Sequence, residues 1–137
     1  MGRPVSGRSG RRCVPKAPRK RWPAIPKRVA GLAGPITVTV RRGALTAPDG
    51  DDCWGLYLPP KRRILLAGGM PPALRWHTLI HEWAHAWLID AGLPNLLHGE
   101  TEEELNRNVE VVCDTLATAL VRSMTTAMNL DPMERKK

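Results

Sequence analysis

The chain has 137 residues, the size of one domain, and 42% of them are hydrophobic, so it can form a core of ordinary size. Its three cysteines are widely spaced and include no CxxC pair, which argues against a disulfide framework and against a four-cysteine zinc site. The net charge of +8 is uneven, because residues 1–63 carry 15 Lys or Arg and 3 Asp or Glu, whereas residues 64–137 carry 6 and 10.

The chain begins with a basic segment rich in Gly, Pro and Ser. Residues 1–28 contain ten Lys or Arg and no Asp or Glu. Such a segment buries too little apolar surface to offset the entropy lost on ordering, so we predict a disordered tail over residues 1–33. A solvated tail is the simpler interpretation. Basic clusters also bind phosphates, and Trp22 could stack on a base.

Three short strands are predicted after the tail. Residues 36–40 alternate apolar and β-branched side chains, and residues 53–58 and 63–67 have similar patterns. Turn residues separate them at 48–50 and 59–61. The short connections predict a small, mostly antiparallel sheet.

Two long helices follow the strands. The first can begin at Pro71-Pro72 and ends near Gly92, and its apolar residues lie on nearly all sides, which is typical of a buried helix. The second begins after Thr101, whose spacing to Glu104 fits a capping box, and continues to about Met128. We find no signal peptide and no apolar run that could span a bilayer, so we expect a cytoplasmic protein without a membrane partner.

The first helix carries the motif His81-Glu82-Trp83-Ala84-His85. Residues four apart leave the same face of a helix, so His81 and His85 can bind one metal ion. Glu82 lies about 100° round the helix, where it can reach a water molecule on that ion. Two imidazole ligands and a carboxylate base are the arrangement of an HExxH zinc peptidase.

A catalytic zinc ion needs a third protein ligand, and Glu110, His98 and His77 are the candidates. Glu110 lies on the second helix among valines, where a carboxylate is costly unless it is paired or bound to a metal ion. His98, in the connection between the helices, is the alternative. Asp114, one turn after Glu110, could accept a hydrogen bond from a ligating histidine.

His77 and Tyr57 are candidates for other roles at the site. His77 precedes His81 by one turn, but three histidines along one face extend over roughly ten ångströms and cannot all bind one ion. We therefore expect His77 to support the site, to border it, or simply to be exposed. Tyr57, His77 and His98 are candidates to stabilise an oxyanion.

The segment from His77 to Leu88 resembles the active-site helix of gluzincin-type minimal metallopeptidases, the ImmA/IrrE-like proteins common in phages and prophages. The segment from Glu110 to Ala117 is similar to their second motif, and the hairpin from Gly55 to Leu66 to the one that precedes their active helix. The resemblance implies Glu110 as third zinc ligand. A SprT-like protein, with His98 as third ligand, is the rival within the class.

Together these observations predict an α+β, zincin-like fold with a small antiparallel sheet on two long helices. The metallopeptidase domain spans residues 34–137. The expected cofactor is Zn²⁺, held by His81, His85 and Glu110, with Glu82 as general base and a protein or peptide as substrate. The alternative is a nucleic-acid-binding protein that uses residues 1–28 beside a metal-stabilised, non-catalytic domain.

Overall fold

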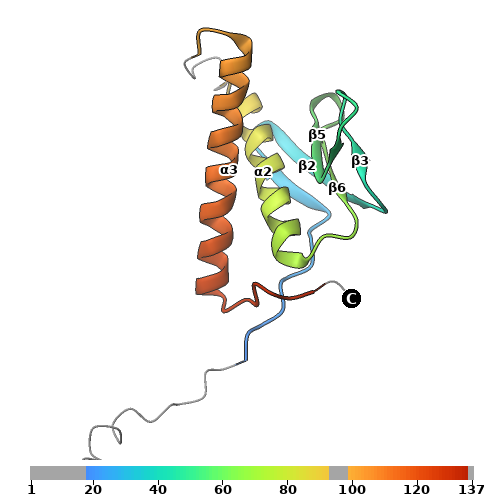
Figure 1. Cartoon of the computed structure of the whole chain (residues 1–137), viewed down its shortest axis with the longest axis vertical. Helices are drawn as coiled ribbons and strands as arrows, with labels where there is room; N and C mark the ends of the chain where they lie inside the picture. Colours follow the sequence, from blue (N-terminus) through green and yellow to red (C-terminus); the bar gives the residue numbers. More distant parts are fainter. Residues whose placement is uncertain (1–17, 93–98, 136–137) are drawn as a thin grey trace, which may run out of the picture.

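The protein is described here by a computed structural model, which places residues 18–92 and 99–135. It has an α+β fold in which helix α2 lies between a sheet and helix α3 (Figure 1). The elements in chain order are β1 (Arg28–Gly31), β2 (Gly34–Arg41), β3 (Leu45–Thr46), β4 (Asp52–Cys53), β5 (Gly55–Leu58), the 3-10 turn η1 (Pro59–Lys61), β6 (Arg63–Ala67), α2 (Pro72–Ala91) and α3 (Glu102–Ala127).

The main sheet has four strands in the order β1-β2-β6-β5. Its pairs β1–β2 and β5–β6 are antiparallel, but β2 and β6 are parallel, with Val38 opposite Ile64. The sheet is therefore mixed, and the prediction of an antiparallel sheet is wrong at this pair. The reason is the long connection after β2, which includes the small β3–β4 sheet and β5 and returns the chain to the start of β2. Strand β5 is left at an edge.

Ordered structure begins before residue 34, so the predicted boundary of the tail is wrong for residues 18–33. Strand β1 pairs with β2, and Val29 belongs to the core. Trp22 is only 6% exposed, and its indole N–H donates to the Asp131 carbonyl at 2.6 Å. It is buried against the C-terminal segment and cannot stack on a base. The rest of the predicted tail, residues 1–17, lies outside the described residues.

The two helices begin and end close to the predicted residues. Gly92 ends α2 in the left-handed conformation (φ 70°), and its N–H bonds to the Leu88 and Ile89 carbonyls. The Thr101 side chain accepts the Glu104 N–H at the start of α3. No helix in the described part of the chain is long and apolar enough to cross a membrane.

The apolar residues of α2 are explained by its two neighbours, since the helix packs on the sheet and on α3. Leu79 on the sheet side is fully buried together with Ile36, Ile64 and Leu66. The helix is not enclosed on all sides, and that part of the prediction is wrong, because Trp87 and Ile89 are 42% and 45% exposed.

Candidate metal centre

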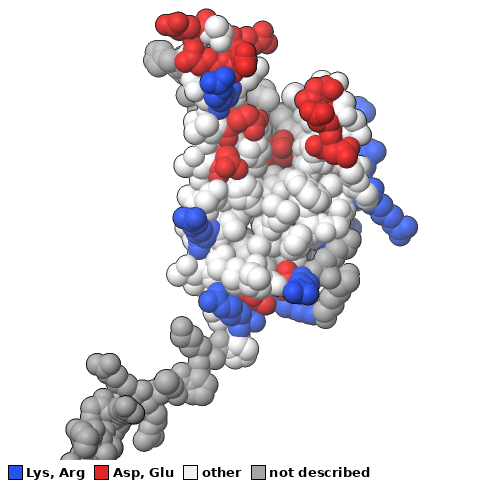
Figure 2. All heavy atoms as spheres, viewed as in Figure 1, with Lys and Arg blue, Asp and Glu red and all other residues white. Residues whose placement is uncertain are grey.

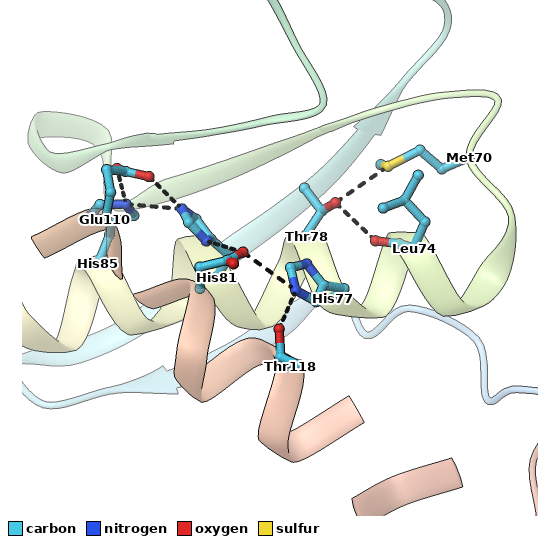
Figure 3. Close-up of polar contacts among 9 residues, drawn as sticks. Met70, Leu74, His77, Thr78, His81, His85, Glu110 and Thr118 are labelled. Atoms are coloured by element: carbon cyan, nitrogen blue, oxygen red, sulfur yellow. Dashed lines mark hydrogen bonds and ion pairs between the residues drawn. The ribbon is translucent and has the colours of Figure 1, made fainter. Parts of the chain in front are cut away.

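Helices α2 and α3 together bring two histidines and a glutamate to one point (Figure 3). The Nε2 atoms of His81 and His85 lie 3.2 Å apart. Glu110 on α3 places Oε2 3.1 Å from His81 Nε2 and Oε1 2.8 Å from His85 Nε2. One ligand atom from each of the three residues lies within 4.8 Å of the others, so the group could hold a metal ion.

The spacing of these atoms fits a tetrahedral ion. Zinc binds imidazole nitrogen and carboxylate oxygen at about 2.0–2.1 Å, so two ligands in a tetrahedral site are separated by about 3.3 Å. The two Nε2 atoms are 3.2 Å apart, and each lies 2.8 or 3.1 Å from a different oxygen of the Glu110 carboxylate, so these separations are close to that value. The two nitrogens and one oxygen are also a donor set that zinc accepts.

Burial favours the ligating form of His85. Desolvation lowers the pKa of this side chain and outweighs the neighbouring Glu110 carboxylate, which raises it. A neutral imidazole presents a lone pair on one nitrogen, and a metal ion requires that lone pair. The buried environment therefore favours the neutral form of His85, which is the form that binds a cation.

Glu82 lies against strand β5 of the sheet, in the cleft that it shares with Glu110. Burial raises the pKa of Glu82 to about 7, while a hydrogen bond from the backbone N–H of Tyr57 on β5 acts in the opposite direction. Gly55 lies against this side chain, because a Cβ built there would be 3.1 Å from Glu82 Cγ and 2.5 Å from Thr78 Cγ2. Only glycine leaves this space for Glu82.

A second group of polar side chains lies beside His81, on the side away from Glu110. Asp114 Oδ1 is 3.8 Å from His81 Nδ1 and 3.5 Å from His77 Nε2. His77 Nε2 is also 3.2 Å from the hydroxyl oxygen of Thr118 (Figure 3). Asp114 thus faces the nitrogen of His81 that points away from the cluster, at a distance longer than a hydrogen bond.

The cluster opens into a cleft of about 370 Å³ between α2, α3 and β5. The cleft is lined by Glu82, by the three clustered residues His81, His85 and Glu110, and by residues of the β5 region. Cys53 borders the cleft as a free thiol, and burial raises its pKa. A ligand in the cleft would therefore meet the three clustered side chains, Glu82 and the edge strand at once.

The predicted site residues have different positions in the structure. His81, His85 and Glu110 come together, but the predicted burial of Glu110 is wrong, since its side chain is 59% exposed. His98 lies outside the described residues. Tyr57 is 8% exposed in the core, and its role at an oxyanion stays a prediction.

Sequence reasoning did not find Gly55 or Cys53. A glycine between two apolar strand residues was the available signal for close approach of another group. Nothing in the local sequence points Cys53 toward the cleft.

No protein-family model matches the sequence, and the search of curated proteins returned no match. The geometry of the cluster is consequently the basis for assigning a function, and the resemblance to the ImmA/IrrE-like or SprT-like proteins stays a prediction.

Proposed function

We propose that the protein is a zinc-dependent peptidase. The observation that carries this proposal is the convergence of His81, His85 and Glu110 in a cleft that also contains Glu82. A metal-binding scaffold requires the three ligands alone. A buried carboxylate beside them, turned to the sheet side of the same cleft, is the additional group that hydrolysis requires.

The three ligands would hold the ion, and Glu82 would move the proton. A zinc ion in this site would polarise the scissile carbonyl and lower the pKa of water toward neutrality. Glu82 accepts the proton of the attacking water and transfers it to the leaving amine. A base whose pKa lies near 7 suits this exchange, because it can both accept and release a proton near neutral pH.

Strand β5 supports a peptide as the substrate. It is an edge of the four-stranded sheet and borders the cleft, so its outer backbone groups, apart from the Tyr57 N–H that donates to Glu82, can pair with an extended chain. Pairing of this kind recognises backbone rather than side chains. It would place a peptide carbonyl next to Glu82 and the three ligands.

Metal content tests the site. We would purify the untagged protein without chelators and measure metals by mass spectrometry, beside His81→Ala and Glu110→Ala. One zinc per chain is expected in the wild type, and both variants should lose most of it. Glu103→Ala is the matched control, because it removes an exposed carboxylate from the same helix. A wild-type protein without metal, even after zinc is supplied, would disprove the proposal.

Activity tests the reaction. Glu82→Gln should keep its zinc but lose peptide hydrolysis by roughly 10²- to 10⁴-fold, the usual contribution of a general base. New N-termini would be counted by mass spectrometry after incubation with an unfolded protein mixture. Equal cleavage by wild type and Glu82→Gln would show that the hydrolysis does not come from this site.

A further inference from the structure

Two adjoining depressions lie at the N-terminal end of α2, and Arg75 lines both. The first has a volume of about 470 Å³, and its lining is Val40, Arg41, Arg42, Gly43, Gly68, Gly69 and Arg75. The second has a volume of about 640 Å³ and includes Arg21 and Trp22 from the N-terminal segment. We call Arg21, Arg41, Arg42 and Arg75 the arginine surface. It shares no residue with the metal cluster or with the cleft.

The backbone around Gly68 brings these arginines together. A Cβ at Gly68 would lie 2.7 Å from the Arg41 carbonyl oxygen and 3.3 Å from the Arg42 Cα, so glycine allows the end of β2 to approach the end of β6. The Gly68 N–H donates to the Gly43 carbonyl at 3.3 Å and fixes this approach. Arg75 donates from Nη2 to the Met70 carbonyl at 3.1 Å, which holds its guanidinium beside the same turn.

The charges of the arginine surface are not neutralised within the described part of the chain. None of its four residues has a carboxylate within 4.0 Å there, in contrast to Arg62, which pairs with Asp90. The Nε atom of Arg75 is buried and has no hydrogen-bond partner among the described residues. The first depression contains no acidic residue.

The second depression does contain two acidic residues, and both already accept backbone hydrogen bonds. Glu134 Oε1 accepts the Trp22 N–H at 3.2 Å, and Asp131 Oδ1 accepts the Met133 N–H at 2.9 Å. They reduce the positive charge beside Arg21, whereas the lining of the first depression includes no carboxylate. Arg41, Arg42 and Arg75 are therefore the centre of the arginine surface.

The charge distribution selects a polyanion as the ligand. Acidic side chains gather at the opposite end of the molecule, over the start of α3 and the β3–β4 loop (Figure 2). The start of α2 adds the positive end of a 20-residue helix dipole to the arginine surface. Residues 1–17 contain five Lys or Arg and no acidic residue, and they join the fold at Pro18, whose carbonyl accepts Asn129 Nδ2 beside the second depression.

We propose that the arginine surface binds the phosphate backbone of nucleic acid. Guanidinium groups bind phosphate oxygens through paired N–H donors, and several of them in a row suit a chain of phosphates rather than one. A backbone that crosses Arg41, Arg42 and Arg75 can continue to Arg21, because Arg75 lines both depressions. This binding site is independent of the proposed peptidase activity, since it lies on a different surface.

Salt-dependent binding tests the proposal. Anisotropy of a labelled 20-base-pair DNA duplex would be measured with the full chain, as wild type, as Arg41→Gln/Arg42→Gln and as Lys61→Gln/Arg107→Gln. The last variant removes the same charge from residues that line neither depression. The arginine-surface variant should bind roughly 10- to 100-fold more weakly near 100 mM salt, and its log–log salt slope should fall by about 1.8, or 0.9 per lost phosphate contact.

Two results would overturn the proposal. All variants retain residues 1–28, so the contribution of that segment cancels in the comparison. Equal losses in both double variants would overturn the proposal, because net charge alone would then explain the binding. Inorganic phosphate that binds through Arg41 and Arg42, without binding of the duplex, would overturn the assignment to nucleic acid. Both variants are exposed-residue changes, and unchanged thermal unfolding and zinc content would confirm intact folds.

Discussion

Glu82 and His81 are adjacent in the sequence but contact different neighbours of α2. A rotation of about 100° per residue turns His81 toward Glu110 on α3 and Glu82 toward β5. The ligands and the proposed base are thus separated by the helix geometry itself. Helix α2 packs on the sheet and on α3, so Glu82 has a neighbour on β5 and His81 has one on α3. Substitutions beside Glu82 and substitutions beside His81 should therefore have separable effects on activity and on zinc binding.

Substitution of Gly55 by alanine tests the sheet side. The new Cβ would lie 2.5 Å from Thr78 Cγ2 and 3.1 Å from Glu82 Cγ, so one of these groups must move. We expect a loss of about 1–3 kcal/mol in the free energy of unfolding, as for other overpacked sites, and lower activity with zinc retained. Urea unfolding and zinc content measure both.

A second substitution supplies the control for this prediction. Thr78→Ser removes the methyl group in closest contact and keeps the hydroxyl that donates to the Leu74 carbonyl at 2.8 Å. The double variant Gly55→Ala/Thr78→Ser should regain part of the lost stability. If it is no more stable than Gly55→Ala alone, the contact with Thr78 is not the cause.

Asp114 tests the side that faces α3. Its carboxylate lies 3.8 Å from His81 Nδ1, the nitrogen that does not join the cluster, and orients that ring electrostatically. Asp114→Ala should weaken zinc binding, by less than the roughly 10- to 100-fold that follows loss of a hydrogen-bonded partner, because this contact is longer than a hydrogen bond. Competition with a chromogenic chelator measures this. Glu103→Ala should bind zinc like the wild type, and an unchanged affinity in Asp114→Ala would contradict the role.

The sequence alone predicted the three clustered residues but not their environment. The spacing of His81 and His85 determines their common face, because helix periodicity is local. The exposure of Glu110 could not be predicted, since it depends on where α3 lies across α2. For the same reason the approach of Gly55 to Glu82, which comes from strand and helix packing, has no local signature beyond the glycine itself.

Among the elements, those with a strong local pattern were predicted and β1 was not. Strand β6 and helices α2 and α3 have the expected bounds within one or two residues. Strand β1 has only four residues in a basic context and is stabilised by pairing with β2, so its composition resembles that of a tail. The parallel β2–β6 pair is likewise a long-range feature.

The ion pair between Arg62 and Asp90 joins three of these elements and gives a pH-dependent prediction. Arg62, after η1, donates to both Asp90 oxygens at 3.0 Å and to the Gly34 carbonyl at 2.9 Å, while Asp90 at the end of α2 accepts the Ala33 N–H at 3.1 Å. These donors, the Arg62 guanidinium first, lower the pKa of Asp90 below its usual 3.8.

A carboxyl group whose folded-state pKa is lowered stabilises the fold above its unfolded pKa and loses this contribution as pH falls through the folded value. Asp90→Asn should therefore melt at a lower temperature than the wild type at pH 7, and the difference should shrink as pH falls below about 3.8. Thermal unfolding followed by circular dichroism at several pH values measures it. A difference that stays constant down to pH 2 would show that the charge of Asp90 is not responsible.

At the scale of the whole molecule, the two described ends of the chain meet below α2 (Figure 1). Lys20 pairs with the segment after α3, since its N–H donates to the Asn129 carbonyl at 2.7 Å and its carbonyl accepts the Asp131 N–H at 2.9 Å. Leu130, which forms a β-bridge with Lys20, is only 1% exposed. These contacts explain why residues 18–33 are ordered despite a composition typical of tails.

Trp22 is the side chain on which this contact depends most. It is 6% exposed and donates its indole N–H to the Asp131 carbonyl, so Trp22→Ala removes a large buried side chain and leaves that carbonyl without its partner. Loss of a buried tryptophan costs about 3–5 kcal/mol, which lowers the melting temperature of a domain of this size by on the order of 10 °C or more. Trp54→Ala is the matched control: at 54% exposure it should change stability by only about 0.5 kcal/mol. Equal melting temperatures for Trp22→Ala and wild type would mean that the N-terminal segment adds nothing to the fold, and the domain would then begin at β1.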